Sequence, residues 1–132
     1  MESFTRKYPQ LNFHLNANAS GLSLKDASFF DFIERKLKNV TFPPERFTLE
    51  ITEDVLMENL GEARGRLEKL KKLNISVALD DFGTGYSSLQ YISQLPVDSL
   101  KIDRSFIDQV LKSRKTASLV KSVIEMARSL NL

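Results

Sequence analysis

The stretch Ile75-Ser-Val-Ala-Leu-Asp-Asp-Phe-Gly-Thr-Gly-Tyr-Ser-Ser-Leu89 decides the fold of this chain. Residues 75–79 alternate between large apolar and small side chains, and this period of two predicts a short buried strand. The strand runs directly into two adjacent carboxylates, Asp80 and Asp81. Adjacent acids repel each other unless a cation or hydrogen-bond donors keep both of them ionised. The end of this strand is therefore a candidate functional site.

A glycine-rich turn follows the two acids. Gly83 and Gly85 let the backbone turn sharply or approach a ligand closely. Ser87 then offers an N-cap to a helix predicted over residues 89–95. A strand, acids, a glycine turn and a helix in this order are typical of a site at the carboxyl ends of strands in an α/β protein. The alternative is a tight turn whose aspartates are only solvated.

Length and composition limit the class of protein. With 132 residues the chain fits one domain, and it is shorter than the roughly 250 residues of a complete (β/α)8 barrel. Its net charge of +2 is too small to indicate a nucleic-acid polymer as partner. It has no cysteine, hence no disulfide framework or thiolate metal site. Because no membrane span or signal peptide is apparent, we expect a soluble, cytoplasmic chain without membrane insertion.

Strands and helices are predicted to alternate along the whole sequence. The predicted strands cover residues 11–17, 47–51, 75–79 and 97–102, and the predicted helices cover residues 29–38, 60–73, 89–95 and 116–130. This order predicts an α/β fold with a parallel sheet. Right-handed crossovers would curl that sheet toward a barrel or an open wound sheet.

Several helix ends have recognisable signals. Ser28 followed by Asp31 is an acidic version of the capping box at a helix start. Leu73-Asn74 predicts a helix stop because asparagine tolerates the left-handed conformation, and the same pair recurs at Leu130-Asn131. The last predicted helix is expected to pack through Leu119, Val123, Ala127 and Leu130.

Polar side chains gather at the ends of the four predicted strands. They are Asn18, Glu50, the pair Asp80 and Asp81, and Lys101. The carboxyl ends of parallel strands lie on one side of a sheet, and hard oxygen ligands in this number suit Mg²⁺, Mn²⁺ or Ca²⁺. A lysine beside them can neutralise charge on a phosphate. We therefore expect a metal site for a phosphate substrate; the alternative for Glu50 is a solvated position.

Four motifs then carry a family resemblance. They are Asn18-Ala-Ser20, Glu50-Ile-Thr-Glu53, Asp80-Asp-Phe-Gly-Thr-Gly-Tyr-Ser-Ser-Leu89 and Leu95-Pro-Val-Asp-Ser-Leu-Lys-Ile-Asp103. With them the chain resembles the EAL family of cyclic di-GMP phosphodiesterases across nearly its full length. The central motif, followed by the lysine strand at the spacing found in the family, is the part of the resemblance that is specific to this family. The resemblance implies a partial (β/α)8 TIM-type barrel of about four β-α units with a parallel sheet.

The resemblance implies hydrolysis of cyclic di-GMP to linear pGpG with two metal ions, Mg²⁺ or Mn²⁺. Asn18, Glu50 and Asp80 would bind the first metal. Asp81 would bind the second and serve as a catalytic residue together with Lys101, which would contact the attacking water or the phosphate. The remaining implied residues are Thr52, Glu53, Gly83, Thr84 and Gly85, which would support the ligands or order the loop, and Ser20 and Asp103, which would bind substrate.

The chain also departs from the family pattern. The Glu-Ala-Leu segment expected before Leu11 and the Glu-Gly-Val-Glu strand expected after Leu132 are not in the sequence. Residues 1–132 thus resemble a partial EAL domain, either a fragment or a natural truncation. We expect it to be inactive on its own and to bind Mg²⁺ or Mn²⁺ weakly or not at all. One alternative is a degenerate domain that binds nucleotide or protein without catalysis. Another takes Lys101 as the Schiff-base lysine of an aldolase-like barrel.

Half of a barrel predicts self-association. Its first and last strands would each lack a neighbour, and unpaired strand edges bind other chains. We also expect apolar side chains near Leu49 and Leu79 to be exposed on the barrel-interior face. A twofold axis would set residues 11–17 of one chain beside residues 99–102 of another and close eight strands. The sequence therefore predicts a homodimer.

Overall fold

The computed structural model describes residue 7 and residues 12–39, 42–57, 60–83 and 92–132. In these residues four strands form one sheet in the order β1-β2-β3-β4, and each neighbouring pair is parallel. The strands are β1 (Leu15–Ala19), β2 (Phe47–Thr52), β3 (Ser76–Phe82) and β4 (Ser99–Ile102). The predicted parallel α/β arrangement is confirmed.

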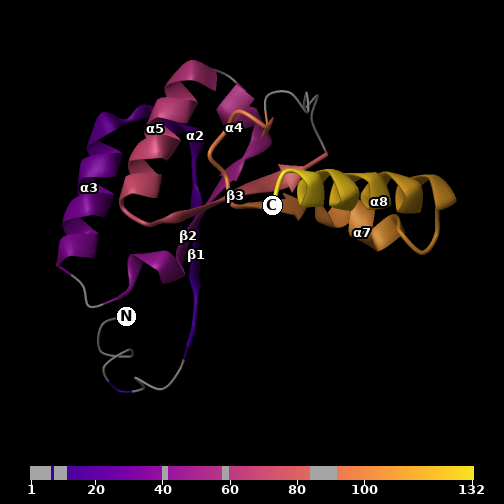
Figure 1. The fold of residues 1–132 in the computed structure, drawn as a ribbon, viewed down its shortest axis with the longest axis horizontal. Helices are drawn as coiled ribbons and strands as arrows, with labels where there is room; N and C mark the ends of the chain where they lie inside the picture. Colours follow the sequence, from indigo (N-terminus) through magenta and orange to yellow (C-terminus); the bar gives the residue numbers. More distant parts are fainter. Residues whose placement is uncertain (1–6, 8–11, 40–41, 58–59, 84–91) are drawn as a thin grey trace.

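Helices connect the strands (Figure 1). They are α2 (Gly21–Lys25), α3 (Ala27–Lys38), α4 (Glu53–Met57), α5 (Leu60–Lys72), α7 (Arg104–Gln109) and α8 (Arg114–Ser129), and a short 3-10 helix covers Pro44–Arg46. The predicted helices at 29–38, 60–73 and 116–130 are confirmed, while α2, α4 and α7 were not predicted. Ser87 and residues 89–91 of the helix predicted at 89–95 lie outside the described residues; of the rest, Ile92 is helical, and residues 93 and 94 form a turn. Within the described part of the chain, no helix is both long and apolar enough to cross a membrane.

The core lies between the sheet and its helices. Alternate strand residues face the helices, and Leu49, Val77 and Leu79 are fully buried there together with Leu67 and Leu70 of α5. Burying one such side chain stabilises the fold by about 1.5–3 kcal/mol. In a strand, the residues between these point to the opposite face. The hydrophobic period of the strands therefore decides which face carries the polar residues.

The prediction that apolar side chains near Leu49 and Leu79 are exposed is wrong. Both side chains lie under the helices, and residues on the opposite face of the sheet include Asn16, Thr48 and Glu50. The error has a simple cause, because the apolar set of a strand faces only one side and the helices already cover that side. The open face of this sheet is polar, so only its unpaired edges remain as an argument for self-association.

The first strand was placed too early in the sequence. The prediction put it at residues 11–17, whereas β1 covers Leu15–Ala19 and pairs with β2 from Leu15↔Phe47 to Ala19↔Ile51. Its partner sets this register, because β2 begins only at Phe47, directly after the 3-10 helix. Asn18, predicted in a turn after the strand, is thus inside it.

The start of α3 also differs from the prediction. Its N-cap is Asp26, whose carboxylate accepts a hydrogen bond from the backbone N–H of Ser28 at 2.8 Å. Hydrogen bonds from Ser28 hold the pKa of Asp26 below its usual value. Ser28 therefore lies inside the helix, and the capping box predicted for Ser28 and Asp31 is wrong. Asp26 directly precedes the first helical residue, Ala27, and from there its side chain can accept a hydrogen bond from a free backbone donor of the first turn.

Both predicted Leu-Asn helix stops are confirmed. Asn74 has φ +58° and Asn131 has φ +60°, which is the left-handed conformation. After α5, the N–H of Asn74 donates to the Lys71 carbonyl at 3.0 Å and that of Ile75 to the Leu70 carbonyl at 3.2 Å. This is the Schellman arrangement, in which the last carbonyls of a helix are satisfied by the residues that leave it.

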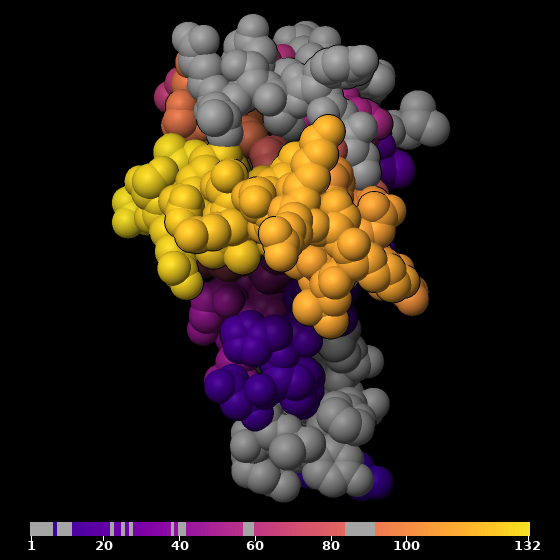
Figure 2. Space-filling model, turned by 90° about the vertical axis from the view of Figure 1, so that its right-hand side faces the viewer, coloured from indigo at the N-terminus to yellow at the C-terminus, as the bar shows by residue number. Residues whose placement is uncertain are grey.

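The predicted packing of α8 is wrong at one position. Val120 is 7% exposed, whereas Leu119, which the sequence placed in the core, is 42% exposed. Val123 and Leu130 pack against the core as predicted. Because each helical residue turns by about 100°, one position decides between core and solvent. In the space-filling view, α7 and α8 lie side by side (Figure 2), and α8 also contacts the edge strand β4.

Candidate active site

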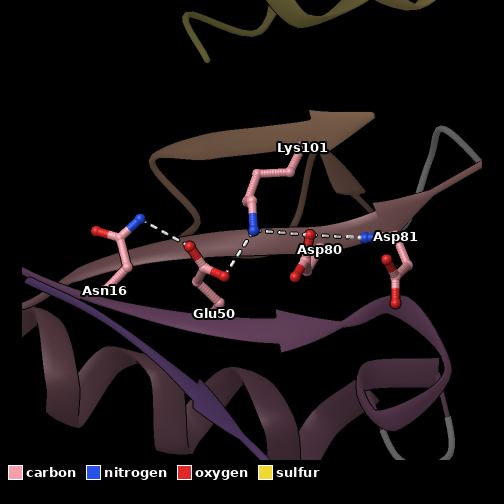
Figure 3. Close-up of polar contacts among 5 residues, drawn as sticks. All are labelled: Asn16, Glu50, Asp80, Asp81 and Lys101. Carbon is pink, nitrogen blue, oxygen red and sulfur yellow. Dashed lines mark hydrogen bonds and ion pairs between the residues drawn. The ribbon is translucent and has the colours of Figure 1, made fainter. Parts of the chain in front are cut away.

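The candidate site lies on the open, polar face of the sheet, toward the carboxyl ends of its strands. Each of the four strands contributes to it, and the side chains of Asn16, Glu50, Asp80 and Lys101 converge across the sheet, whereas the Asp81 carboxylate points away from them (Figure 3). Asn18 on β1 is the register partner of Glu50 on β2, and Thr52 is the register partner of Asp80 on β3. Lys101 projects from β4 toward these acids.

Glu50 is the most buried of the predicted ligands. It is 7% exposed, and its two carboxylate oxygens have different donors. The amide nitrogen Nδ2 of Asn16 donates to Oε1 at 2.7 Å, and the Lys101 ammonium donates to Oε2 at 2.6 Å. A carboxylate taken out of water is tolerated when it is paired in this way. The alternative of a solvated Glu50 is therefore wrong.

Lys101 links the acids of two strands. Its Nζ lies 2.6 Å from Glu50 Oε2 and 3.0 Å from Asp80 Oδ1. The hydrogen bond to Glu50 is the main cause that raises the pKa of Lys101; partial burial opposes it, and the contacts with Asp80 add to it. A Schiff-base lysine needs a lowered pKa to be nucleophilic. The surroundings of Lys101 therefore favour a charged ammonium and disfavour the aldolase-like alternative.

A β-bulge places Asp80 and Asp81. Leu79 pairs with Leu100 and Phe82 pairs with Ile102, so two residues of β3 oppose Lys101 alone on β4. Asp81 takes the left-handed conformation with φ +55°, and its N–H donates to Asp80 Oδ1 at 3.1 Å. Without the extra residue, Phe82 would point to the open face; with it, Phe82 is buried in the core. The bulge thus keeps both acids at the strand end and restores the apolar pattern after them.

Gly83 follows the bulge and is enclosed on two sides. It has φ +99°. Its backbone nitrogen lies 3.5 Å from Oε2 of Glu53, the first residue of α4. A Cβ at this position would lie 3.0 Å from Cε2 of the Phe106 ring of α7. Glu53 is 4% exposed. These contacts agree with a supporting role for Glu53 and Gly83, while Thr84 and Gly85 lie outside the described residues.

The two predicted substrate-binding residues both cap helices. The Ser20 hydroxyl accepts a hydrogen bond from the N–H of Ser23 at 3.2 Å at the start of α2. Asp103 caps α7 by accepting from the N–H of Ser105 at 2.8 Å. Hydrogen bonds from the Ser105 hydroxyl and N–H hold the pKa of Asp103 below its usual value. Substrate binding by either residue stays a prediction.

The carboxylates of the site determine whether it suits a divalent cation. In the part of the chain that the structure describes, no three Asp, Glu, His or Cys side chains surround a common point. However, Glu50 and Asp80 both contact one cation, the Lys101 ammonium. Two carboxylates that converge on one cation position offer the hard oxygen ligands that Mg²⁺ and Mn²⁺ prefer. The donor chemistry fits such a metal.

Asn16 is the site residue that sequence reasoning missed. It lies two residues before Asn18 on the same face of β1, and its side chain contacts Glu50. The signal was present in the sequence as two asparagines at a spacing of two, which puts both on one face of a strand. Recognising the contact required the register of β1 against β2.

Comparison with protein families gives a match over the whole chain. The family described as "EAL domain" matches residues 1–132. The cyclic di-GMP phosphodiesterase NbdA of Pseudomonas aeruginosa is 40% identical over 115 residues, which are 87% of this chain and 15% of that protein. The chain therefore spans only a small part of the length of this relative.

Solved structures agree with this match. The PaMucR phosphodiesterase in complex with cyclic di-GMP superposes with a TM-score of 0.90 at 31% identity, covering 99% of this chain and 53% of that one. The EAL domain of Mycobacterium smegmatis DcpA gives a TM-score of 0.89 at 34% identity, covering 99% of this chain and 60% of that one. The likeness confirms the predicted fold, part of a (β/α)8 TIM-type barrel.

Proposed function

The chain belongs to the EAL domain family, and from this we propose that it forms part of a domain that hydrolyses cyclic di-GMP to linear pGpG with two divalent cations. The printed names of NbdA and PaMucR describe phosphodiesterases, and the PaMucR structure contains cyclic di-GMP. Because the chain spans only part of either protein, its own activity, substrate and partners are proposals. A cytoplasmic location belongs to the same proposal.

One observation carries the proposal. Glu50 and Asp80, from neighbouring strands, contact the same cation at the carboxyl edge of the sheet. A purely binding module has no chemical need for two carboxylates held this close beside a lysine and a third acid, Asp81. Such a group is suited to holding metal ions against a phosphodiester.

Each residue of the site would have a role that follows from its chemistry. Glu50, Asp80 and Asn18 would hold one Mg²⁺ or Mn²⁺, and Asp81 the other. The bound ions would supply an activated water and neutralise charge on the phosphate. Lys101 would hold a phosphate oxygen by a charge-assisted hydrogen bond, since its raised pKa keeps it charged and its side chain is 43% exposed. Glu53 would keep the Gly83 turn in place beside the acids.

The alternative is a degenerate EAL domain that binds nucleotide or a protein without hydrolysis. We further propose that the 132-residue chain on its own turns over cyclic di-GMP poorly. Among the described residues no three acids surround a common point, and groups that act as a unit lose most of their effect when the unit is incomplete. An active phosphodiesterase and a degenerate domain differ in whether the product of the complete gene hydrolyses cyclic di-GMP.

The test measures linear pGpG formed from cyclic di-GMP in the presence of Mn²⁺. We expect the product of the complete gene to be active, Asp80→Asn to lower its rate by about a hundredfold or more, and the 132-residue chain alone to give little product. Asp108→Asn, an exposed acid paired with Arg104, is the matched control and should leave the rate unchanged. Binding of cyclic di-GMP without any hydrolysis by the gene product would support the degenerate domain instead.

A homodimer is the second part of the proposal, supported by the sheet edges alone. Within the described residues, β1 and β4 are the edge strands of the sheet. A twofold axis that sets β1 of one chain beside β4 of another would pair both edges in parallel and close eight strands. We expect light scattering to give the mass of a dimer in dilute solution. A monodisperse monomer that unfolds cooperatively would contradict the paired barrel.

A further inference from the structure

We propose that Asp98 is a positioning residue, which fixes the register of β4 on β3 and so holds Lys101 at the acids of the site. Asp98 directly precedes β4 and lies in the motif at residues 95–103. The contacts that carry this inference involve neither a metal ion nor a substrate. Its consequence for hydrolysis rests on the proposed function.

The side chains of β4 specify its register only weakly. The strand has four residues and lies at the edge of the described sheet, and Leu100 packs against the core but stays partly exposed like the others. The strands β2 and β3, in contrast, each contain several buried residues. Register is strongly specified only where one face of a strand is buried. The bulge between Leu79 and Phe82 also interrupts the ladder that joins β4 to β3, so a further contact is needed to select one alignment.

Asp98 makes such a contact with both backbone polar groups of Val77 in β3. Its N–H donates to the Val77 carbonyl at 2.8 Å, and its carboxylate oxygen Oδ2 accepts a hydrogen bond from the Val77 N–H, also at 2.8 Å. Val77 is fully buried, and a buried N–H that loses its acceptor is costly. Any other alignment of β4 would move the Asp98 carboxylate away from this N–H. The pair therefore favours the observed register over its neighbours.

Lys71 holds the same carboxylate from the helix side of the sheet. Its Nζ, in the last turn of α5, contacts Asp98 Oδ1. Each oxygen of Asp98 thus has its own donor, one from the helix and one from β3. The side chains of Lys71 and Asp98 are 37% and 36% exposed, and an ion pair in such a position contributes little stability. The hydrogen bond with Val77 is therefore the contact that selects the register.

The register of β4 decides where the Lys101 side chain lies. A shift of one residue would turn Lys101 from the open face to the face that the helices cover. A shift of two residues would keep the face but move the side chain by about 7 Å along the sheet. Lys101 Nζ lies 2.6 Å from Glu50 Oε2 and 3.0 Å from Asp80 Oδ1 (Figure 3), and neither shift would preserve both contacts. Asp98 therefore acts on the site through Lys101 without touching the acids.

A double-mutant cycle tests this role by urea unfolding of the 132-residue chain in a chelator. Lys101→Met is made in the unmodified chain and in Asp98→Ala, and the measured effect is the factor by which it raises the unfolding equilibrium constant. We expect this factor to be about tenfold smaller, or less still, in Asp98→Ala, because the contacts that Lys101→Met removes are then already lost. If Asp98 only stabilised the fold, the two effects would be independent and the factor would not change.

Three further variants separate the hydrogen bond to Val77 from the charge of Asp98. Asp98→Asn keeps an oxygen that can accept the Val77 N–H, and Lys71→Met keeps the carboxylate, so both should preserve the large effect of Lys101→Met. Asp98→Glu keeps the charge but displaces the carboxylate by one methylene group, so it should reduce the effect. Asp108→Asn, at an exposed acid of α7, is the matched control and should leave the effect unchanged.

The outcomes separate this inference from the proposed function. An unchanged effect of Lys101→Met in Asp98→Ala overturns the positioning role, even if the product of the complete gene hydrolyses cyclic di-GMP. A reduced effect supports the role, even if that product is inactive and the proposed function is wrong. If Asp98→Ala does not unfold cooperatively, the cycle in Asp98→Glu decides, and an unchanged effect there overturns the role. A reduction of equal size in Asp108→Asn would overturn it too.

Discussion

Lys101→Met is expected to destabilise the chain by about 3 kcal/mol when no divalent cation is present, the low end for removing one partner of a buried ion pair. The reason is the position of Glu50, which is 7% exposed and would keep the Asn16 amide but lose its ammonium partner. Asp80 would lose the same contact. We take the low end because the Lys101 side chain is 43% exposed and water screens part of the interaction.

Divalent cations should reverse much of this loss. In Lys101→Met the two carboxylates face each other without the ammonium, so Mg²⁺ should bind and stabilise the variant more than the unmodified chain. Urea unfolding in a chelator and in Mg²⁺ measures both effects. The matched control is Lys121→Met, which removes an exposed helical ion pair with Glu125 at 3.8 Å and should change the free energy of unfolding by less than about 0.5 kcal/mol. Equal losses in both variants would contradict the role given to Lys101.

The ion pair between Lys101 and Glu50 also predicts that the free energy of unfolding changes at alkaline pH. The pKa of Lys101 in the folded chain is raised above the ordinary value of 10.5. A raised pKa means that the stabilisation is fully present below 10.5 and is lost as the pH rises through the higher value of the folded state. The difference in stability between the unmodified chain and Lys101→Met should therefore be constant between neutral pH and 10.5 and shrink above it. A difference that does not change across this range would show that the ammonium is not the stabilising form.

The sequence predicted the parts of the fold that local chemistry decides. The alternation in residues 47–51 placed Glu50 on the face opposite Leu49, and both positions were found there. The left-handed stops at Asn74 and Asn131 needed only the tolerance of asparagine for positive φ. Each of these features depends on a few adjacent residues, so a sequence pattern is sufficient to predict it.

Features that depend on strand pairing were not predicted. The register of β1 is set by where β2 begins, so its start moved from residue 11 to Leu15 and the contact between Asn16 and Glu50 was missed. The bulge at Asp80 and Asp81 depends on pairing with β4. A signal for it exists in the sequence, because Leu79 and Phe82 are both apolar but three residues apart, which does not fit a period of two. An extra residue between them resolves the conflict.

In the site too, some features depend on local sequence and others depend on strand pairing. The residue types Asn18, Glu50, Asp80, Asp81 and Lys101 could be read from the chain, because acids and a lysine at strand ends are unusual and converge in a parallel sheet. Their mutual contacts could not, because these depend on how far each strand extends beside its neighbour. The ammonium of Lys101 between Glu50 and Asp80 is one such contact.

The bulge predicts that substitutions of Asp81 affect stability and cation binding differently. Asp81 has φ +55°, and a left-handed residue costs about 1–2 kcal/mol unless it is glycine, asparagine or aspartate. Asp81→Asn should therefore keep the free energy of unfolding within about 0.5 kcal/mol, whereas Asp81→Ala should lose about 1 kcal/mol. Under the proposed function both variants lose a carboxylate ligand. Both should then lower the affinity for Mn²⁺ by at least about tenfold, and in the product of the complete gene both should lower hydrolysis of cyclic di-GMP.

Urea unfolding and calorimetric titration with Mn²⁺ on the same three proteins test this separation. The decisive variant is Asp81→Asn, because it keeps the backbone conformation and the shape of the side chain and changes only the charge. Asp54→Asn, an exposed acid at the start of α4, controls for the loss of one negative charge from the chain. If Asp81→Asn binds Mn²⁺ as tightly as the unmodified chain, Asp81 is not a metal ligand, and the bulge then serves only to return Phe82 to the core. If Asp81→Ala is as stable as Asp81→Asn, the left-handed conformation does not constrain this position.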